Sequence, residues 1–334
     1  MKRVAIVVLN WNGIKDTLSC LNSLQKQSYK NFNIIVVDNG SNDESRSLLM
    51  RYNLKHKNTF VIYNTKNLGF AGGVNTGIKY ALDNGFEYIA LFNNDAISDK
   101  NWLQGLVDSI QPKEIGISTG LLLRENGKTI DSTGDWYSIW GLPFPRDRNN
   151  STSKAAKSGV VFGATGGASL YKSELFKTIG LFDEDFFAYY EDVDISFRAQ
   201  LAGWSVVYEP KSVAYHKQGA TANKISGFAT YQTFKNLPLL FIKNVPRRLL
   251  FSIGFRFYFA YIMMFLNATK NGSGKQAIKG LAKSIALKPK KIRERHQIQK
   301  SKRVGDDYIK SILWPDLPPD QTGLRKLRKF FIGK

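Results

Sequence analysis

The sequence predicts an α/β protein, built on a mostly parallel sheet with helices on both faces and continued by a basic helical C-terminal region. Short β-branched apolar runs alternate with amphipathic stretches through the first third of the chain, as in strand–helix–strand units. These runs are apolar at consecutive positions, as in strands buried on both faces. Residues 1–222 carry 24 Lys/Arg against 22 Asp/Glu, whereas residues 223–334 carry 24 against 5. We therefore expect a boundary near residue 222.

The individual elements follow from the same patterns. Leu18, Leu21 and Leu24, for example, recur at the spacing of one helix face. The less regular part beyond residue 115 predicts one further helix at 191–204 and one further strand at 204–210. In the first part, strands are predicted at 3–10, 32–39, 60–64 and 88–95, and helices at 16–27, 41–52 and 71–85.

Polar clusters follow all four of the first strands. Sheets of this kind bind ligands beyond the carboxyl ends of their parallel strands, so we expect these clusters to form one site. They are "NWNG" at 10–13, "DNGSND" at 38–43, "NTKNLGFAGG" at 64–73 and "NNDA" at 93–96.

The carboxylates in these clusters each have two interpretations. Asp95 suits a ligand of Mg²⁺ or Mn²⁺ that also binds phosphates; the more common role is that Asn94 or Asp95 caps a helix starting near Ser98. Asp38 suits a hydrogen bond to the base or ribose of a nucleotide, or an Asx-turn. The glycines of 67–77 let the backbone approach a phosphate. That segment matches neither the dinucleotide nor the P-loop motif.

The stretch "FFAYYEDVDISFR" at 186–198 places Glu191, Asp192 and Asp194 at a predicted helix start, directly after aromatic residues. Acidic residues there interact favourably with the helix dipole. A carboxylate beside an aromatic wall also becomes more basic through desolvation, which suits a general base. His216 follows a strand-like run, where a structural role and a ligand role both stay open.

The C-terminal region is rich in aromatic, aliphatic and basic residues. Its most apolar window, 249–266, contains Arg256 and is marginal for crossing a bilayer, which takes roughly 20 apolar residues. Such a mixture suits helices lying at the lipid headgroups. Residues 288–303 add eight basic side chains against Glu294, a polybasic stretch suited to anionic lipid.

The remaining composition bounds the class of protein. Cys20 is the only cysteine, which excludes a disulfide framework and fits a reducing compartment. The apolar part of "MKRVAIVVLNWNG" is about six residues, shorter than a signal-peptide core, so we expect a strand there and no secretion signal. A pI near 9.8 also suits nucleic-acid binding. The polar strand ends are nearly neutral, however, which argues against it.

Taken together, these stretches resemble the family 2 glycosyltransferases, in particular the rhamnosyltransferase-like members that build bacterial surface polysaccharides. The resemblance implies a glycosyltransferase fold of the A type (GT-A) over 1–222, with a nucleotide-sugar half at about 1–115 and an acceptor half at about 116–222. The matching stretches are "VVLNWNG", "VVDNGSND", "NLGFAGGVNTG", "LFNNDA", "GGASLYKSELFKTIGLFDEDFFAYYEDVDISFRAQLAGW" and "YHKQGAT".

The resemblance also implies roles for single residues. "NND" matches the metal motif of the family with its first carboxylate replaced by Asn93, so Asp95 would bind Mg²⁺ or Mn²⁺, with His216 completing the shell. Asp38 would contact the nucleobase, and Asp192 would be the catalytic base. The nucleotide-sugar would also contact Asn10, Asn12, Asn67, Gly69, Asn94 and Gly167, and the acceptor would contact Glu191 and Trp204.

The implied reaction is a direct displacement that inverts the anomeric configuration. The donor suggested first is dTDP-rhamnose, with UDP-linked N-acetylglucosamine, galactose or glucose as alternatives. The acceptor would be a glycan on a polyprenyl diphosphate, held near the cytoplasmic face of the cell membrane by residues 223–334 of a peripheral protein. A homo-oligomer is possible. The other candidates are a sugar-nucleotide nucleotidyltransferase, which needs a more basic N-terminal loop, and a non-catalytic membrane scaffold, against which Asp95 and Asp192 argue.

Overall fold

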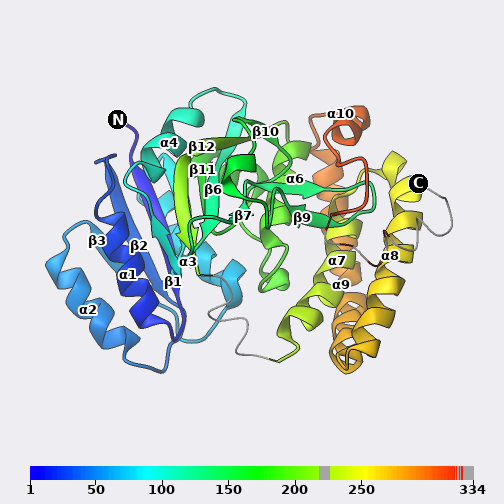
Figure 1. The fold of residues 1–334 in the computed structure, drawn as a ribbon, viewed down its shortest axis with the longest axis horizontal. Coiled ribbons are helices and arrows are strands. Elements are labelled where there is room, and N and C mark those ends of the chain that lie inside the picture. The colour runs from blue at the N-terminus through cyan, green and yellow to red at the C-terminus, as the bar shows by residue number, and fades with distance from the viewer. Residues whose placement is uncertain (218–225, 320, 322, 324, 326–334) are drawn as a thin grey trace.

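The computed structural model describes residues 1–217, 226–319, 321, 323 and 325 (Figure 1). Its main sheet has the strand order β10-β12-β6-β11-β4-β1-β2-β3, with β5 paired to β12 and β7 to β6, and β8 pairs with β9 separately. The strands are β1 Val4–Asn10, β2 Phe32–Asp38, β3 Thr59–Tyr63, β4 Tyr88–Asn93, β5 Ala96–Ser98, β6 Ile115–Arg124, β7 Ile130–Ser132, β8 Asp135–Tyr137, β9 Pro143–Pro145, β10 Gly159–Val161, β11 Ala168–Lys172 and β12 Ser205–His216.

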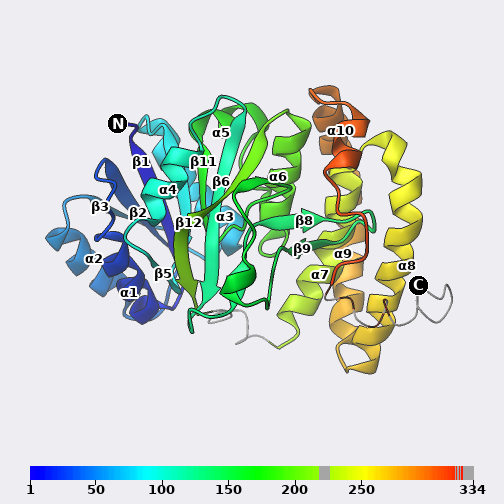
Figure 2. The ribbon, with the colours of Figure 1, turned by 45° about the horizontal axis from the view of Figure 1, so that its top comes forward.

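Helices cover both faces of this sheet and form one end of the molecule (Figures 1 and 2). They are α1 Ile14–Leu24, α2 Ser45–Lys55, α3 Gly69–Asp83, α4 Trp102–Ser109, α5 Ser173–Ile179, α6 Glu191–Leu201, α7 Phe228–Asn244, α8 Leu250–Lys270, α9 Gly274–Lys300 and α10 Asp306–Ser311.

The predicted first half of the fold is confirmed. Strands β1 to β4 are parallel to one another where they pair, and alternate residues of each strand face opposite layers. Ile6 lies in a core with Leu21 of α1 and Trp102 of α4, whereas Val7 lies in a core with Val74 of α3. This two-sided burial explains why the strands are apolar at consecutive positions.

The second half of the sheet is mixed rather than parallel. Strand β11 is antiparallel to both β4 and β6, between which it lies, and β12 runs parallel to β6. The strand predicted at 204–210 extends to His216, because β12 continues past an irregularity between Glu209 and Val213 to pair with β5. Strands β7, β8, β9 and β10 have three residues each, too few to show a periodicity, which is why the sequence did not predict them. The ten-residue β6 was also not predicted.

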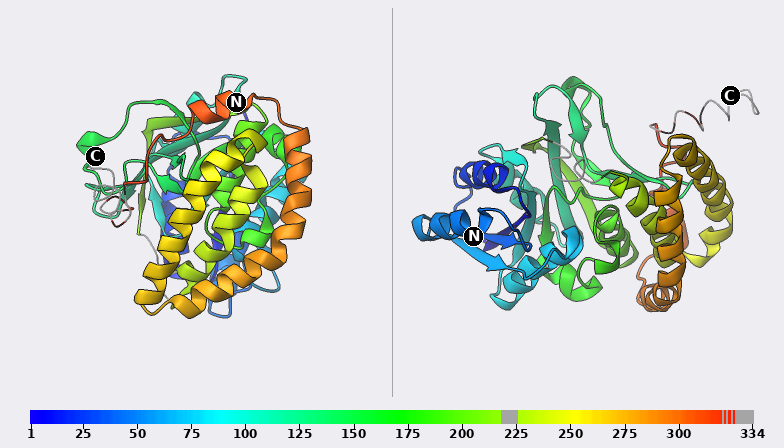
Figure 3. Two further views of the ribbon diagram at one scale, coloured as in Figure 1. Left: turned by 90° about the vertical axis from the view of Figure 1, so that its right-hand side faces the viewer. Right: turned by 90° about the horizontal axis from the view of Figure 1, so that it is seen from below.

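The C-terminal helices pack directly onto the sheet domain. Helices α7, α8 and α9 lie at the end of the molecule opposite β3, with α8 outermost (Figure 3). One hydrophobic cluster contains Phe186 and Phe197 together with Phe234, Leu240 and Phe257. The two regions predicted on either side of residue 222 therefore share a core.

Part of the predicted polybasic stretch turns out to hold the fold together, which corrects its interpretation as wholly lipid-facing. Lys291 is fully buried, and Lys290 forms an ion pair with Asp185. Arg295 donates a hydrogen bond to the carbonyl oxygen of Ile242. These cations face the rest of the chain because α9 packs along α7, parallel to it (Figure 3).

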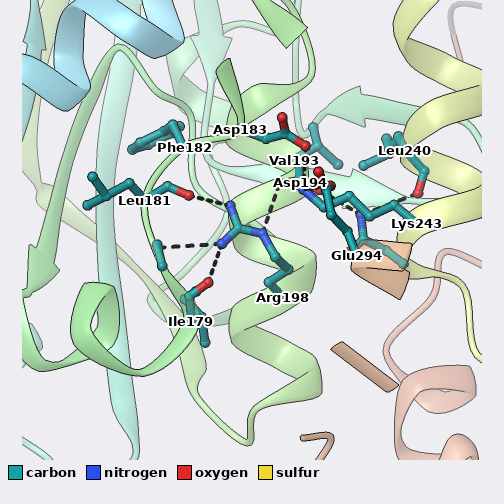
Figure 4. Close-up of polar contacts among 12 residues, drawn as sticks. Ile179, Leu181, Phe182, Asp183, Val193, Asp194, Arg198, Leu240, Lys243 and Glu294 are labelled. Carbon is teal, nitrogen blue, oxygen red and sulfur yellow. Dashed lines mark hydrogen bonds and ion pairs between the residues drawn. The ribbon is translucent and has the colours of Figure 1, made fainter. Parts of the chain in front are cut away.

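A buried ionic network joins α6 to the C-terminal helices (Figure 4). The Asp194 carboxylate lies 2.9 Å from Arg198 Nε and 2.9 Å from Lys243 Nζ, and Asn244 donates to it at 2.8 Å. Lys243 Nζ also lies 2.6 Å from Asp183 Oδ2. Arg198 and Lys243 hold the pKa of Asp194 below its usual range although burial opposes ionisation.

Candidate active site

A cavity of about 880 Å³ opens where β1 and β4 end and α6 begins. Eight of the residues predicted for the site line it: Asn67, Gly69, Asn94, Asp95, Gly167, Glu191, Asp192 and His216. Four of them, Asn67, Gly69, Asn94 and Asp95, follow parallel strands that end at one edge. The other four reach the same edge from β11, α6 and β12 of the second half. The cavity therefore occupies the predicted sheet edge.

Asp95 and His216 meet through strand pairing. The antiparallel pairing of β5 and β12 sets His216 opposite Ala96, and His216 Nε2 lies 3.1 Å from Asp95 Oδ1. The other ring nitrogen, Nδ1, lies 2.8 Å from Asp131 Oδ2 on β7. Burial disfavours the charged ring, but the hydrogen bonds with Asp131 and Asp95 raise the pKa of His216 to about 9. Asp131 thus fixes the ring and leaves Nε2 facing Asp95 and the cavity.

Asn10, Asn12 and Asp38 lie behind the cavity rather than on its lining. Asn10 and Asp38 are buried, and Asn10 Nδ2 donates to Asp38 Oδ1 at 2.8 Å. Ser41 also donates to Asp38, and its hydroxyl accepts from the backbone N–H of Asn12. Thr17 bridges Asn10 to the cavity residue Asn94. The network links the ends of β1, β2 and β4, and the predicted nucleotide contacts of these residues stay predictions.

Asp192 is the second residue of α6, and its carboxylate lies in the cavity. The backbone N–H of Gly166 donates to its Oδ2 at 3.0 Å, and that of Val193 donates to its Oδ1 at 2.9 Å. Burial raises the pKa of Asp192 above its ordinary range, and these two hydrogen bonds oppose the shift. Burial and the nearby Asp192 also raise the pKa of Glu191. Asp192 is thus a fixed carboxylate of raised basicity.

Trp204 does not reach this cavity, contrary to its predicted place on the acceptor side. It follows the C-terminal end of α6, whereas Glu191 and Asp192 lie in the first turn, and an 11-residue helix is about 16 Å long. Its ring packs against Gly116, and Lys172 lies over it. Of the stretch 166–204, Gly166, Gly167 and residues 187–193 line the cavity, whereas Trp204 does not.

Several lining residues were missed by the prediction from sequence. Arg148 Nη2 lies 3.0 Å from Asp131 Oδ1, and Asp135 is a second buried carboxylate on the lining. The stretch "DSTGD" at 131–135 is a polar cluster of the same kind as those after the strands, so the signal was present but lay in the irregular half. An aromatic wall completes the cavity: Phe70, Phe144, Phe187, Tyr189, Tyr190 and Phe228.

We expect Gly69→Ala to destabilise the protein more than Gly85→Ala. Both glycines have left-handed backbones, with φ of 74° and 69°, so both alanines pay about 1–2 kcal/mol for the conformation. A Cβ at Gly69 would lie 2.5 Å from the carbonyl oxygen of Phe187, whereas a Cβ at Gly85 meets no described residue within 4 Å. Thermal unfolding of both variants measures the difference, and equal losses would contradict the close contact.

A second cluster of carboxylates is already neutralised by a lysine. Oxygens of Asp183, Asp185 and Glu294 lie close enough together for one metal ion. Lys291 Nζ, however, lies 2.5, 2.8 and 2.9 Å from an oxygen of Asp183, Asp185 and Glu294 respectively. An ammonium group therefore takes the place a cation would take.

A parallel first half, a mixed second half and a carboxylate cluster at their junction are the features of the glycosyltransferase A architecture. The family model described as glycosyl transferase family 2 matches residues 5–180. The chain belongs to this family.

The curated relatives are similar over part of the chain. A poly-beta-1,6-N-acetyl-D-glucosamine synthase of Staphylococcus aureus is 27% identical over 208 residues, which are 60% of this chain and 46% of the relative. The synthase of the same name from Staphylococcus epidermidis is 26% identical over 206 residues, with the same coverage. The matched part therefore spans about half the length of these relatives.

Two solved structures share the fold. A mannosyltransferase from Pyrobaculum calidifontis, in complex with GDP-Man and Mn²⁺, has a TM-score of 0.56 at 16% identity and covers 90% of this chain and 86% of its own. GalNAc-T7 with UDP, GalNAc and Mn²⁺ has a TM-score of 0.54 at 19% identity, and the match covers 64% of this chain and 43% of GalNAc-T7. The expected GT-A fold is thus confirmed.

Proposed function

We propose that this protein is an inverting glycosyltransferase that moves a sugar from a nucleotide-diphosphate donor to an acceptor hydroxyl. The observation that carries the proposal is that Asp192 and the Asp95–His216 pair line the same cavity. A volume of about 880 Å³ is in the range of small-molecule sites. A general base and a cation-binding pair in one cavity are the groups that displacement at an anomeric carbon uses.

In this proposal Asp192 removes the proton from the acceptor hydroxyl. The hydroxyl oxygen then bonds to the anomeric carbon on the face opposite the nucleotide, and the bond from that carbon to the diphosphate breaks. One displacement inverts the anomeric configuration. The N–H groups of Gly166 and Val193 hold the Asp192 carboxylate in place, and burial supplies the basicity.

The residues at Asp95 fit a divalent metal ion. A carboxylate oxygen with an imidazole nitrogen suits Mn²⁺ better than Mg²⁺, which prefers oxygen ligands. Asp131 on the far nitrogen of His216 is the orienting partner typical of a ligating histidine. Asp95 and His216 would hold the ion, which would neutralise charge on the leaving diphosphate.

For the donor we propose dTDP-rhamnose first, with UDP-linked N-acetylglucosamine, galactose or glucose as the alternative. The similarity to the staphylococcal synthases favours the alternative sugar N-acetylglucosamine. For the acceptor we propose a polyprenyl-diphosphate-linked glycan. The wall formed by Tyr189, Tyr190 and Phe228 offers flat faces on which sugar rings pack.

We place the protein on an anionic membrane surface, peripheral on the cytoplasmic side. Among the described residues, one helix, Arg247–Lys270, is long and apolar enough to cross a membrane by length and composition. One face of it packs on α7, with Phe257 stacked on Phe241, and the opposite face is exposed. The exposed apolar stripe consists of Phe251, Phe255, Tyr258, Phe259, Ile262 and Leu266, and exposed lysines at 270, 275, 279 and 283 follow it.

This arrangement favours a helix that lies in the headgroup region. We expect the double variant Phe251→Ser/Phe255→Ser to bind vesicles of anionic lipid at least tenfold more weakly, because burying one such side chain contributes about 1.5–3 kcal/mol. Leu54→Ser on α2 is the control, since Leu54 is 78% exposed but distant in the sequence from the C-terminal helices. Sedimentation with vesicles measures the binding. Equal binding of the wild type, the double variant and Leu54→Ser would place the lipid contact elsewhere.

The test of the function is turnover by the purified chain with Mn²⁺ or Mg²⁺. A panel of nucleotide sugars is offered with lipid-linked acceptors, and release of nucleoside diphosphate is recorded. Acceptor-dependent release from one donor, lost in Asp95→Ala, identifies the donor and supports the cation site. Binding of donors with no release for any acceptor would favour the non-catalytic scaffold.

A further inference from the structure

The chain takes an unusual path just before Asp192. Between the 3-10 helix Glu184–Phe186 and α6, three residues that are not glycine have left-handed backbones: Phe187, Tyr189 and Tyr190, with φ of 63°, 68° and 71°. L-residues adopt this region rarely and at a cost, so such a segment persists only where its surroundings hold it. Residues 187–190 all line the cavity.

One side chain of α7 holds this segment. Asn236, which is fully buried, donates from Nδ2 to the carbonyl oxygens of Phe186, Ala188 and Tyr189 at 2.9, 2.9 and 2.8 Å. The neighbouring Lys235 donates to the carbonyl oxygens of Asp185 and Phe186 at 2.9 and 3.1 Å. Helix α7 therefore binds carbonyl groups just before the strained residues and within their segment.

A further carbonyl of the segment is held from α3. The carbonyl oxygen of Phe187 accepts a hydrogen bond from the backbone N–H of Ala71, at the start of α3. The segment is thus suspended between α3 of the nucleotide half and α7 of the C-terminal region. Only a donor can serve at position 236, because three carbonyl oxygens converge there and would repel a carboxylate.

We infer that Asn236 is a positioning residue for the proposed reaction. It holds the segment 187–190, with its three left-handed residues, and so sets where α6 begins and where the Asp192 carboxylate stands in the cavity. The inference rests on the proposed transfer reaction. On this inference the C-terminal helices have two roles: they position the active site, and they provide the proposed contact with lipid.

The test compares Asn236→Ala and Asn236→Asp with Asn244→Ala in the full chain. Asn244 is a fully buried asparagine on the same helix, but its amide binds Asp194 and the carbonyl oxygen of Leu240 instead of the segment. Hydrogen–deuterium exchange is measured for peptides that contain residues 186–190, below the unfolding midpoint of each variant. Steady-state kcat and KM are measured for donor and acceptor.

We expect both Asn236 variants to exchange faster in 186–190, with the control unchanged there. Their kcat should fall about 10²-fold, since small misplacements of catalytic groups have effects of that size, with the donor KM retained. Unchanged exchange in 186–190, or an equal fall of kcat in Asn244→Ala, would overturn the inference. If the wild type transfers no sugar to any acceptor, the proposed function fails instead, and the exchange data alone decide whether Asn236 holds the segment.

Discussion

Replacing Asp192 with asparagine should lower turnover by about 10²–10⁴-fold, the usual contribution of a general base. The substitution keeps the shape of the side chain and an acceptor oxygen for one of the two N–H groups, Gly166 or Val193, so the fold and donor binding should be retained. Nucleoside diphosphate release under saturating donor and acceptor measures the loss, and calorimetric titration with donor checks binding.

The pH dependence of kcat/KM in the wild type should also identify Asp192 as the base. Burial raises the pKa of Asp192, and a base works only when deprotonated. The logarithm of kcat/KM should therefore fall as the pH drops through this raised pKa, above the value of about 4 of an ordinary aspartate. Asp135→Asn is the matched control, because Asp135 is another carboxylate on the cavity lining. A larger loss in Asp135→Asn than in Asp192→Asn would move the base to Asp135.

Asp194→Asn, two residues further along α6, should act on stability instead. Its carboxylate compensates the buried cations of Arg198 and Lys243 (Figure 4). Removing one partner of a buried ion pair costs about 3–5 kcal/mol, a large part of the 5–15 kcal/mol that stabilises a typical protein. Chemical denaturation should show this loss, and Asp192→Asn should not.

The acid sensitivity of folding gives a second measurement. The pKa of Asp194 is lowered in the folded state, so its contribution is present above the unfolded-state pKa and is lost as the pH falls through the folded-state value. The free energy of unfolding of Asp194→Asn should therefore depend less on pH in the acid range than that of the wild type. Glu87→Gln is the control, because Glu87 pairs with Lys2 at the surface and such pairs contribute little. Equal effects of Asp194→Asn and Glu87→Gln on the unfolding midpoint would contradict the role of the network.

The contrast between Asp192 and Asp194 marks where prediction from sequence stopped. Both lie in "YYEDVD", and the sequence offered the helix dipole as an explanation for either. The structure separates them by what surrounds them: backbone N–H groups and the cavity for Asp192, and three buried side chains of α6 and α7 for Asp194. No local pattern carries that information, because the partners are up to 50 residues away.

The sequence alone determined the first half of the sheet and its ligand-binding edge. Apolar runs and the polar residues after them are local signals, and parallel strands must end at one edge. Only the tertiary structure decided that Asp131 holds His216, that Trp204 lies far from the cavity, and that Asn236 of the C-terminal region holds the segment before Asp192. These facts depend on contacts between segments that are distant along the chain. The packing of the irregular second half and of α7 creates those contacts, and the spacing of residues in the sequence does not reveal them.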